Sequence, residues 1–177
     1  FSAAKTATEY LIGLGHRKIA FIGGQFNYSS INDRIHGYRE ALDEADISVS
    51  PALVIEDIAQ WSNEGGAEGV YRLYSKQDRP TAILVSSDFL IGGVYRAVRE
   101  LKLTIPSDVS VISFDDSPLA SYLDPPVTSC RQPLLEIGAL AARRLVRLIT
   151  TPPAERRPEK QSVKMPFIVR QSTRRII

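Results

Sequence analysis

Four short apolar runs of this chain end abruptly in polar residues or glycines, and these ends are where chemistry is expected. They are Gly23 and Gly24 after residues 19–22, Glu56 and Asp57 after 53–55, Ser86, Ser87 and Asp88 after 82–85, and Asp115 and Asp116 after 109–114. Runs of valine, isoleucine and phenylalanine without polar alternation are typical of strands buried on both faces of a parallel sheet. Parallel strands bring their polar ends to one edge, where open α/β sheets bind ligands. The sequence therefore predicts a polar rim for a small molecule.

Arg34 and Asp115 are the two side chains best suited to hold such a molecule. Arg34 lies near the start of a helix predicted over 31–45, and its planar guanidinium can bind two neighbouring hydroxyls or a carboxylate. The alternative is a surface arginine or an ion pair with Asp115. The Asp115 carboxylate can accept hydrogen bonds from ligand hydroxyls. Its alternative role is to cap a short segment over 117–122, which Asp116 or Ser117 could fill instead.

Trp61, Ser87 and Asp88 are weaker candidates for the same rim. Trp61 lies in a loop after the second apolar run, and an aromatic face can pack on the C–H face of a sugar. Ordinary core packing would explain a tryptophan there equally well. Ser87 and Asp88 follow the third run. For Asp88 we favour the alternative that it caps a helix over 89–102.

Several other kinds of site lack support in this sequence. Gly23 and Gly24 follow a strand, but neither of the glycine-rich nucleotide-binding patterns is present. His16 and His36 have no paired nucleophile, and no cysteine or histidine spacing fits a metal site. Cys130 is the single cysteine, which excludes an internal disulfide. We therefore expect no enzyme, no metal and no cofactor.

The order of the predicted elements indicates a doubly wound α/β fold. The chain has 177 residues, which suits one domain. Helical periodicity alternates with the apolar runs up to residue 114, through short connections. The predicted helices cover 2–14, 31–45, 63–76 and 89–102, and the predicted strands cover 19–22, 53–55, 82–85 and 109–114. This pattern predicts a mainly parallel sheet with helices on both faces.

The rhythm changes after Asp116, where prolines interrupt regular structure. A short extended piece at 127–129 precedes a strongly amphipathic helix over 133–149 and a last strand over 163–169. Breaks near 129–132 and 158–162 suggest that helix 133–149 belongs to a different lobe from residues 1–128.

The charge is unevenly distributed along the chain. Residues 1–130 have a net charge of −6 and residues 131–177 a net charge of +8. We interpret the basic part as a solvated helix face and loop, because its arginines are scattered and lack interleaved aromatic residues. No apolar run approaches the ~20 residues of a membrane span, and no export signal is visible. We therefore expect a cytoplasmic protein that does not contact a membrane.

Six segments, in order along almost the whole chain, resemble the LacI/GalR family of transcriptional regulators. They are LGHRKIAFIGG at 14–24, RIHGY at 34–38, PTAI at 80–83, IPSDVSV at 105–111, FDD at 114–116 and PPVTSCRQP at 125–133. The resemblance implies a periplasmic-binding-protein-like fold of type I, with two lobes around an effector cleft. It divides the chain into 1–129 in the C-terminal lobe, 130–162 as crossover and helix of the N-terminal lobe, and 163–177 as the return strand and tail.

The same resemblance implies the site and the partners. Family ligand positions fall on Arg34, Trp61, Ser87 and Asp115, and more weakly on Ser30. The family usually has asparagine before the aspartate where this chain has Ser87, so the contact at that position is expected to differ. A homodimer is implied through helix 89–102 and the turn 117–123. Its expected exposed apolar residues are Leu90, Ile91, Val94, Tyr95 and Leu123.

The resulting hypothesis is the effector-sensing and dimerising part of a LacI-type repressor controlled by a small sugar-like ligand. DNA binding to an operator is expected to belong to a head domain outside these residues. The main alternative is a periplasmic sugar-binding protein with the same fold. An enzyme of doubly wound fold is the least supported alternative, since no phosphate loop or acid–base pair is present.

Overall fold

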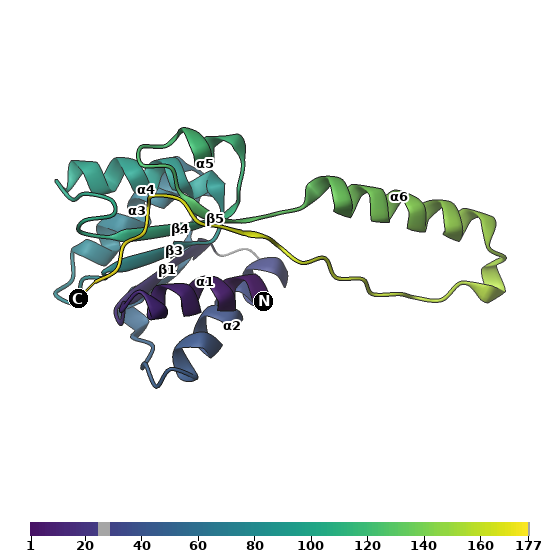
Figure 1. Ribbon diagram of the computed structural model, residues 1–177, viewed down its shortest axis with the longest axis horizontal. Helices are drawn as coiled ribbons and strands as arrows, with labels where there is room; N and C mark the ends of the chain where they lie inside the picture. Colours follow the sequence, from purple (N-terminus) through teal and green to yellow (C-terminus); the bar gives the residue numbers. More distant parts are fainter. Residues whose placement is uncertain (25–28, 177) are drawn as a thin grey trace.

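The computed structural model describes residues 1–24 and 29–176, and their strands form one twisted sheet (Figure 1). The order across the described sheet is β2-β1-β3-β4-β5-β6. Strands β1 to β5 are parallel, and β6 runs antiparallel to β5. The strands are β1 (Ile19–Gly24), β2 (Val54–Ile58), β3 (Ala82–Val85), β4 (Ser110–Asp115), β5 (Thr128–Arg131) and β6 (Phe167–Ile168). The predicted fold class, an α/β fold with a mainly parallel sheet, is confirmed.

Helices cover both faces of the sheet, and each face has its own apolar core. Alternate residues of a strand point to opposite faces, so Ile83 packs under α3 and α4, whereas Leu84 packs under α1 and α2. The described helices are α1 (Ser2–Gly13), α2 (Ser29–Asp43), α3 (Asn63–Tyr74), α4 (Asp88–Glu100), α5 (Pro118–Tyr122) and α6 (Leu134–Thr150), with short 3-10 turns η1 (Pro51–Leu53) and η2 (Pro153–Glu155). The two layers of helices bury the central strands β1 and β3 completely, as their uninterrupted apolar sequences predict, whereas Glu56 and Asp57 of the edge strand β2 remain exposed.

The last strand is shorter than the sequence pattern indicates. The pattern predicts a strand over 163–169, but only Phe167 and Ile168 pair with β5. Strand β5 itself has four residues, so it offers a short edge, and Pro166 has no N–H to donate to a ladder. The prediction of a seven-residue strand is therefore wrong, although the segment does return to the sheet.

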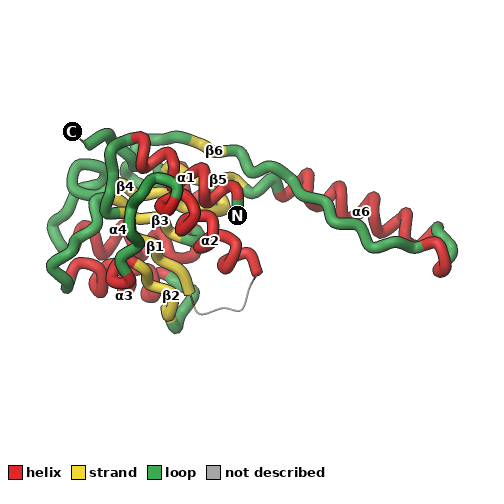
Figure 2. Tube along the Cα trace, turned by 90° about the horizontal axis from the view of Figure 1, so that it is seen from below, coloured by secondary structure: helices red, strands yellow, loops and turns green. Residues whose placement is uncertain are grey.

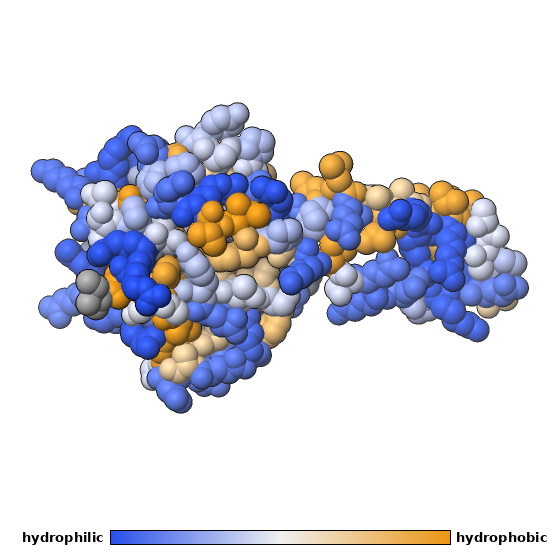
Figure 3. Space-filling view, in the orientation of Figure 1, coloured by the Kyte–Doolittle hydropathy of each residue, from blue (hydrophilic) through white to orange (hydrophobic). Residues whose placement is uncertain are grey.

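Residues 132–166, here called the arm, project away from the sheet (Figures 1 and 2). Helix α6 forms one side of the arm, and none of its residues is buried against the described part of the chain. Its apolar side chains remain exposed, including Leu135 at 92% and Ile149 at 69%. Figure 3 shows hydrophobic surface along one side of the arm. Such exposure is expected for an amphipathic helix whose packing partner lies outside the described residues.

The C-terminal tail returns across the body and is fastened there by His16. The His16 ring is buried, with Nδ1 2.9 Å from the Thr81 hydroxyl and Nε2 3.1 Å from the Arg174 carbonyl oxygen. The Ile176 amide also donates to the Leu14 carbonyl, at 2.9 Å. The imidazole therefore joins the turn before β1, the start of β3 and the tail.

The stability of the protein should depend on the protonation of His16. Burial first, and then the positive charge of Arg174, lowers the pKa of His16 below its ordinary value of 6.5. The His16 imidazole of the unfolded chain binds a proton near pH 6.5, whereas in the folded protein it binds one only at lower pH. The free energy of unfolding should therefore fall as the pH drops below 6.5, and level off below the folded pKa.

Urea unfolding at pH 7.5 and at pH 5.5 measures this effect. The loss of stability between the two pH values should be smaller in His16→Gln than in the unchanged protein. An equal pH dependence in His16→Gln and in the unchanged protein would show that His16 does not contribute.

Candidate functional site

The carboxylate of Asp115, at the end of β4, is the centre of a hydrogen-bond network at the carboxyl edge of the sheet. Its Oδ1 accepts from Arg34 Nη2 at 3.2 Å and from the Gln132 side-chain amide. Its Oδ2 accepts from the Ser87 hydroxyl at 2.6 Å and from the Asp88 backbone N–H at 3.3 Å. Donors from three parts of the chain thus converge on this acid of β4: from α2, from the start of α4 and from the residue after β5.

Arg34 is held in a fixed orientation by three groups. Its Nη2 pairs with Asp115, its Nη1 donates to the Ser86 carbonyl, and its guanidinium lies 4.5 Å from the centre of the Phe114 ring. The Arg34 side chain is 12% exposed and that of Asp115 is 23% exposed. The sequence left a ligand role and an ion pair with Asp115 as alternatives for Arg34, and the structure shows the ion pair. The remaining exposure of both side chains keeps them within reach of a small molecule.

Ser87, and not Asp88, caps helix α4. Ser87 has extended backbone angles and its hydroxyl accepts from the Phe89 N–H at 3.3 Å, whereas Asp88 already lies in the first turn. The Asp88 carboxylate turns away and accepts from the Ser113 hydroxyl at 2.5 Å and from the Ser117 N–H at 2.6 Å. The favoured prediction that Asp88 caps its own helix is therefore wrong. Burial raises the pKa of Asp88 above its ordinary value.

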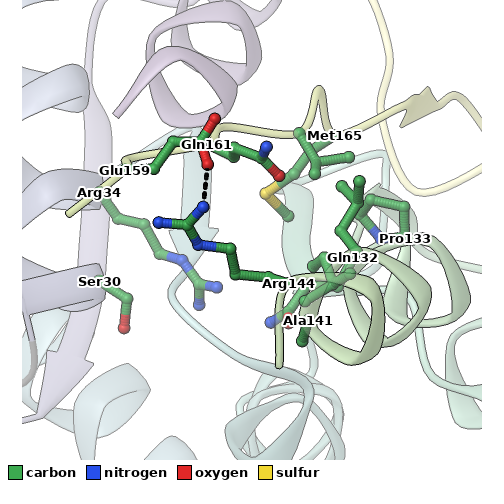
Figure 4. Close-up of a pocket in the computed structure, with 12 residues that line it drawn as sticks. Ser30, Arg34, Gln132, Pro133, Ala141, Arg144, Glu159, Gln161 and Met165 are labelled. Atoms are coloured by element: carbon green, nitrogen blue, oxygen red, sulfur yellow. Dashed lines mark hydrogen bonds and ion pairs between the residues drawn. The ribbon is translucent and has the colours of Figure 1, made fainter. Parts of the chain in front are cut away.

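A cavity of about 540 Å³ lies between the arm and the start of α2 (Figure 4). Ser30 and Arg34 line one side, and Gln132 lies at the base of the arm. The opposite wall combines apolar side chains of α6 with the ion pair between Arg144 and Glu159. Ser30 is exposed at the rim. The predicted residues Ser30 and Arg34 therefore share a cavity, and Ser87 and Asp115 adjoin it through Arg34.

Trp61 stands apart from this cavity. It lies in the bend between β2 and α3, and its partly buried ring packs against the core under α3 and α4. The sequence left sugar stacking and core packing equally open for this residue, and the described structure shows a packing contact.

Gln132 is the site residue that the sequence reasoning missed. It follows the carboxyl end of β5 and makes two hydrogen bonds to Asp115. Its side-chain amide donates to the Asp115 carboxylate, and its backbone N–H donates to the Asp115 carbonyl oxygen at 3.1 Å. The rule that polar residues after parallel strands share one edge would have found it, had residues 127–129 been treated as a fifth parallel strand. The residue also lies inside one of the segments that carry the family resemblance.

Three residues expected at an exposed dimer surface are buried. Leu90, Ile91 and Val94 have no exposed surface and belong to the core under α3 and α4. The expectation that they are exposed is wrong, because this side of α4 packs on the sheet and on α3. Tyr95 and Leu123 are partly buried. The large apolar side chains exposed on α4 and α5 are Phe89 at 68%, Leu119 at 41% and Tyr122 at 83%.

Between residues 1–24 and 29–176, no group of three or more histidine, cysteine, aspartate or glutamate side chains is arranged to hold a metal ion. In the same ranges, no helix is both long enough and apolar enough to cross a membrane.

The sequence matches the periplasmic binding protein-like domain family over residues 8–173. The ribose operon repressor of Haemophilus influenzae is 40% identical over 146 residues, which are 82% of this chain and 43% of that repressor. The transcriptional repressor PurR of Haemophilus influenzae is 33% identical over 150 residues, which are 85% of this chain and 44% of that protein. The chain thus spans less than half the length of these relatives.

A solved structure shows the same fold. The crystal structure of a LacI family transcriptional regulator from Enterococcus faecium, with bound ribose, superposes with a TM-score of 0.86 at 28% identity. The match covers 98% of this chain and 63% of the Enterococcus chain. The fold, the family match and the repressor relatives agree with one another. This chain belongs to the LacI family of transcriptional regulators, and its fold is the periplasmic-binding-protein-like domain of that family.

Proposed function

We propose that this chain is the effector-sensing and dimerising part of a LacI-type repressor whose effector is a small, neutral, sugar-like molecule. The observation that carries the proposal is the Asp115 network beside the cavity that contains Arg34. A carboxylate accepts hydrogen bonds from hydroxyls and a guanidinium donates to their oxygens. Because Arg34 and Asp115 already neutralise each other, the pair suits an uncharged polyol better than an anion or a cation.

The relatives support the same class of ligand. One is a ribose operon repressor, and a related regulator holds ribose in its crystal structure. Ribose contains vicinal hydroxyls, which fit a planar fork and a carboxylate held side by side. We expect Ser30 to add a hydroxyl at the rim of the cavity.

We further propose that the arm belongs to a second lobe, and that the effector acts by changing how the two lobes meet. The sequence prediction placed 130–162 in the other lobe, but Cys130 and Arg131 belong to β5, so residues 1–131 would form the first lobe. Helix α6 and the chain up to 162 would contribute to the other lobe, and 163–177 would return to the first. The unburied apolar face of α6 supports this division. An effector shifts the arrangement only if it binds one arrangement more tightly than the other. The change would reach operator DNA through a head domain outside these residues.

Titration calorimetry on the intact regulator with D-ribose tests the ligand assignment. Asp115→Ala should weaken binding by about 1.5–3 kcal/mol, the value of a hydrogen bond to a charged group, which is roughly 10- to 150-fold in Kd. Arg34→Ala should weaken it by a similar factor. Asp57→Ala removes an exposed acid at the far end of the sheet and should change nothing. Unchanged affinity in both Asp115→Ala and Arg34→Ala would contradict the assignment.

For the dimer we propose a symmetric contact through the exposed apolar residues of α4 and α5. These elements adjoin, because Ser117 before α5 donates to Asp88 in α4, and Tyr95 donates to the Pro125 carbonyl at 2.9 Å. The adjoining helices α4 and α5 therefore expose three large apolar side chains, those of Phe89, Leu119 and Tyr122. Sedimentation of Tyr122→Glu should show a weaker dimer than the unchanged protein. An unaltered dimer in that variant and in Phe89→Glu would place the interface elsewhere.

The repressor reading also sets the expected location. A protein that acts on operator DNA works in the cytoplasm, whereas the alternative, a periplasmic sugar-binding protein, works outside it. The named relatives are repressors, which favours the first reading.

A further inference from the structure

Asp116 lies beside the effector-site acid, but its carboxylate contacts a different set of partners. The side chain is 2% exposed and lies between two arginines. Its Oδ2 accepts from Arg131 Nε at 2.6 Å, and its Oδ1 accepts from Arg170 Nη1 at 2.6 Å. Each carboxylate oxygen thus pairs with a guanidinium group. This geometry fixes the position of Asp116 and of the two segments that carry Arg131 and Arg170.

The two arginines lie on the two connections between the arm and the body. Arg131 is the last residue of β5, immediately before the chain leaves for the arm. Arg170 comes two residues after β6, where the chain has returned. Arg170 Nη1 also donates to the Val127 carbonyl at 2.7 Å. Figure 1 shows both connections leaving the same edge of the sheet, so one carboxylate joins the outgoing and the returning strand.

Asp116 is also joined to the effector site through consecutive residues. Arg131 bonds Asp116, and the next residue, Gln132, bonds Asp115. Asp115 and Asp116 both have positive φ angles, of 94° and 56°, in the left-handed region. This unusual backbone turns two neighbouring acids toward two different groups of partners. A displacement of either acid is therefore carried to the base of the arm.

We propose that Asp116 is a positioning residue that fixes the direction in which the arm leaves the sheet and links that direction to the occupancy of the Asp115 site. The link to occupancy rests on the proposed function, whereas the fixing of the arm does not. An ionised acid is required, because both partners are positively charged. An amide of the same size would present an N–H group to one of the two arginines.

The electrostatics favour the ionised form. Burial opposes the charge of Asp116, but the hydrogen bonds and charges of Arg170 and Arg131 outweigh it and hold the pKa below its ordinary value. Arg170 is 17% exposed and Arg131 is 49% exposed. Loss of the acid would leave Arg170 largely buried without its carboxylate partner, so the returning strand should loosen first.

Distance measurements between two spin labels on the intact regulator test the proposal. One label replaces Asp43 on α2 and the other replaces Arg143 on α6, both exposed, while Cys130 is buried and stays unlabelled. Labelled protein is mixed with excess unlabelled protein, so that only distances within one chain are measured. The unchanged protein should give one narrow distance distribution, and D-ribose should shift it.

Asp116→Asn should broaden the distribution without ligand and abolish the shift with D-ribose. Asp57→Asn, an exposed acid paired with Arg72 at the far edge, should behave like the unchanged protein. Arg131→Gln removes a half-exposed partner and serves if Asp116→Asn does not fold, whereas Arg131→Lys keeps the charge and should restore a narrower distribution.

Two outcomes overturn the proposal or part of it. If Asp116→Asn and Arg131→Gln lower the melting temperature but leave the distance distribution as narrow as before, Asp116 has only a structural role. If D-ribose shifts the distribution equally in the unchanged protein and in Asp116→Asn, the link to the Asp115 site is wrong. Absence of any shift in the unchanged protein contradicts ribose as effector. In that case the width of the distance distribution without ligand, compared between the unchanged protein and Asp116→Asn, still decides whether Asp116 fixes the arm.

Discussion

Gly93→Ala should unfold the domain or remove most of its stability. Gly93 lies in α4 where that helix meets α3, and a Cβ atom there would lie 1.6 Å from the Asn63 carbonyl oxygen and 2.9 Å from the Ala67 backbone nitrogen. The contact is reciprocal, since a Cβ on Gly66 of α3 would lie 2.0 Å from the Leu90 carbonyl oxygen. These are backbone atoms, so no side chain can rotate away and the two helices must separate.

Separation of α3 and α4 would open the larger core of the protein. Both helices contribute side chains to it, among them Val70 and Val94, which are fully buried. Overpacking usually costs about 1–3 kcal/mol, and a clash between two backbones exceeds that range. Domains are stable by only about 5–15 kcal/mol, so we expect a loss of more than about 3 kcal/mol to leave much of the protein unfolded.

Urea unfolding of Gly93→Ala and Gly13→Ala measures this effect against a matched control. Gly13 lies in helix α1, and a Cβ there would have nothing within 4 Å. Alanine is a better helix former than glycine by about 0.5–1 kcal/mol, so Gly13→Ala should be neutral or stabilising. The same urea midpoint for Gly93→Ala and the unchanged protein would contradict the close packing of α3 and α4.

Phe114→Ala should cost about 3–5 kcal/mol of stability, as expected for truncation of a buried aromatic side chain. Phe114 is fully buried in the core under α1 and α2, and it lies directly before Asp115. Its ring also supports the Arg34 guanidinium, 4.5 Å from the ring centre. The variant should therefore both open a cavity in the core and release one of the three contacts that orient Arg34.

Phe114→Leu separates these two effects. Leucine retains most of the apolar volume and should cost about 1.5 kcal/mol or less, but it removes the attraction between the guanidinium and the ring. We expect Phe114→Leu to fold stably and to bind D-ribose more weakly than the unchanged intact regulator.

Urea unfolding and calorimetry measure the two effects. Tyr122→Ala truncates an aromatic ring that is 83% exposed, and in dilute solution it should change stability by no more than about 0.5 kcal/mol. A cost below about 1 kcal/mol for Phe114→Ala would mean that the ring is not part of a packed core.

Much of the fold follows from local patterns in the sequence. Strand β3 begins and ends at the residues predicted from its apolar run, 82–85. The first four helices begin and end within two residues of their predicted limits. These elements are specified by the periodicity of apolar residues within each segment, so the information lies in a few neighbouring residues. The convergence of Ser87 and Asp115 also followed from the sequence, because both lie at the carboxyl ends of parallel strands, whereas Arg34 reaches the same edge from helix α2.

The orientation of helix α4 could not be read from its sequence. The consecutive apolar residues Phe89, Leu90 and Ile91 spread over roughly half of the circumference near its start. Which of them become buried depends on the close approach to α3 at Gly93, which is a contact between segments some 30 residues apart. The tertiary packing therefore decided that Leu90, Ile91 and Val94 belong to the core and Phe89 to the surface.

The tertiary structure likewise decided which side chains donate hydrogen bonds to Asp115. The partners of Asp115 are separated from it by 81 residues for Arg34, 28 for Ser87 and 17 for Gln132. Residue type shows that each of these side chains can donate a hydrogen bond. Only the register of the sheet and the entry angles of the helices determine which donor reaches which oxygen. Local sequence thus determined the elements and the edge where the site lies, and long-range packing determined the geometry of the site.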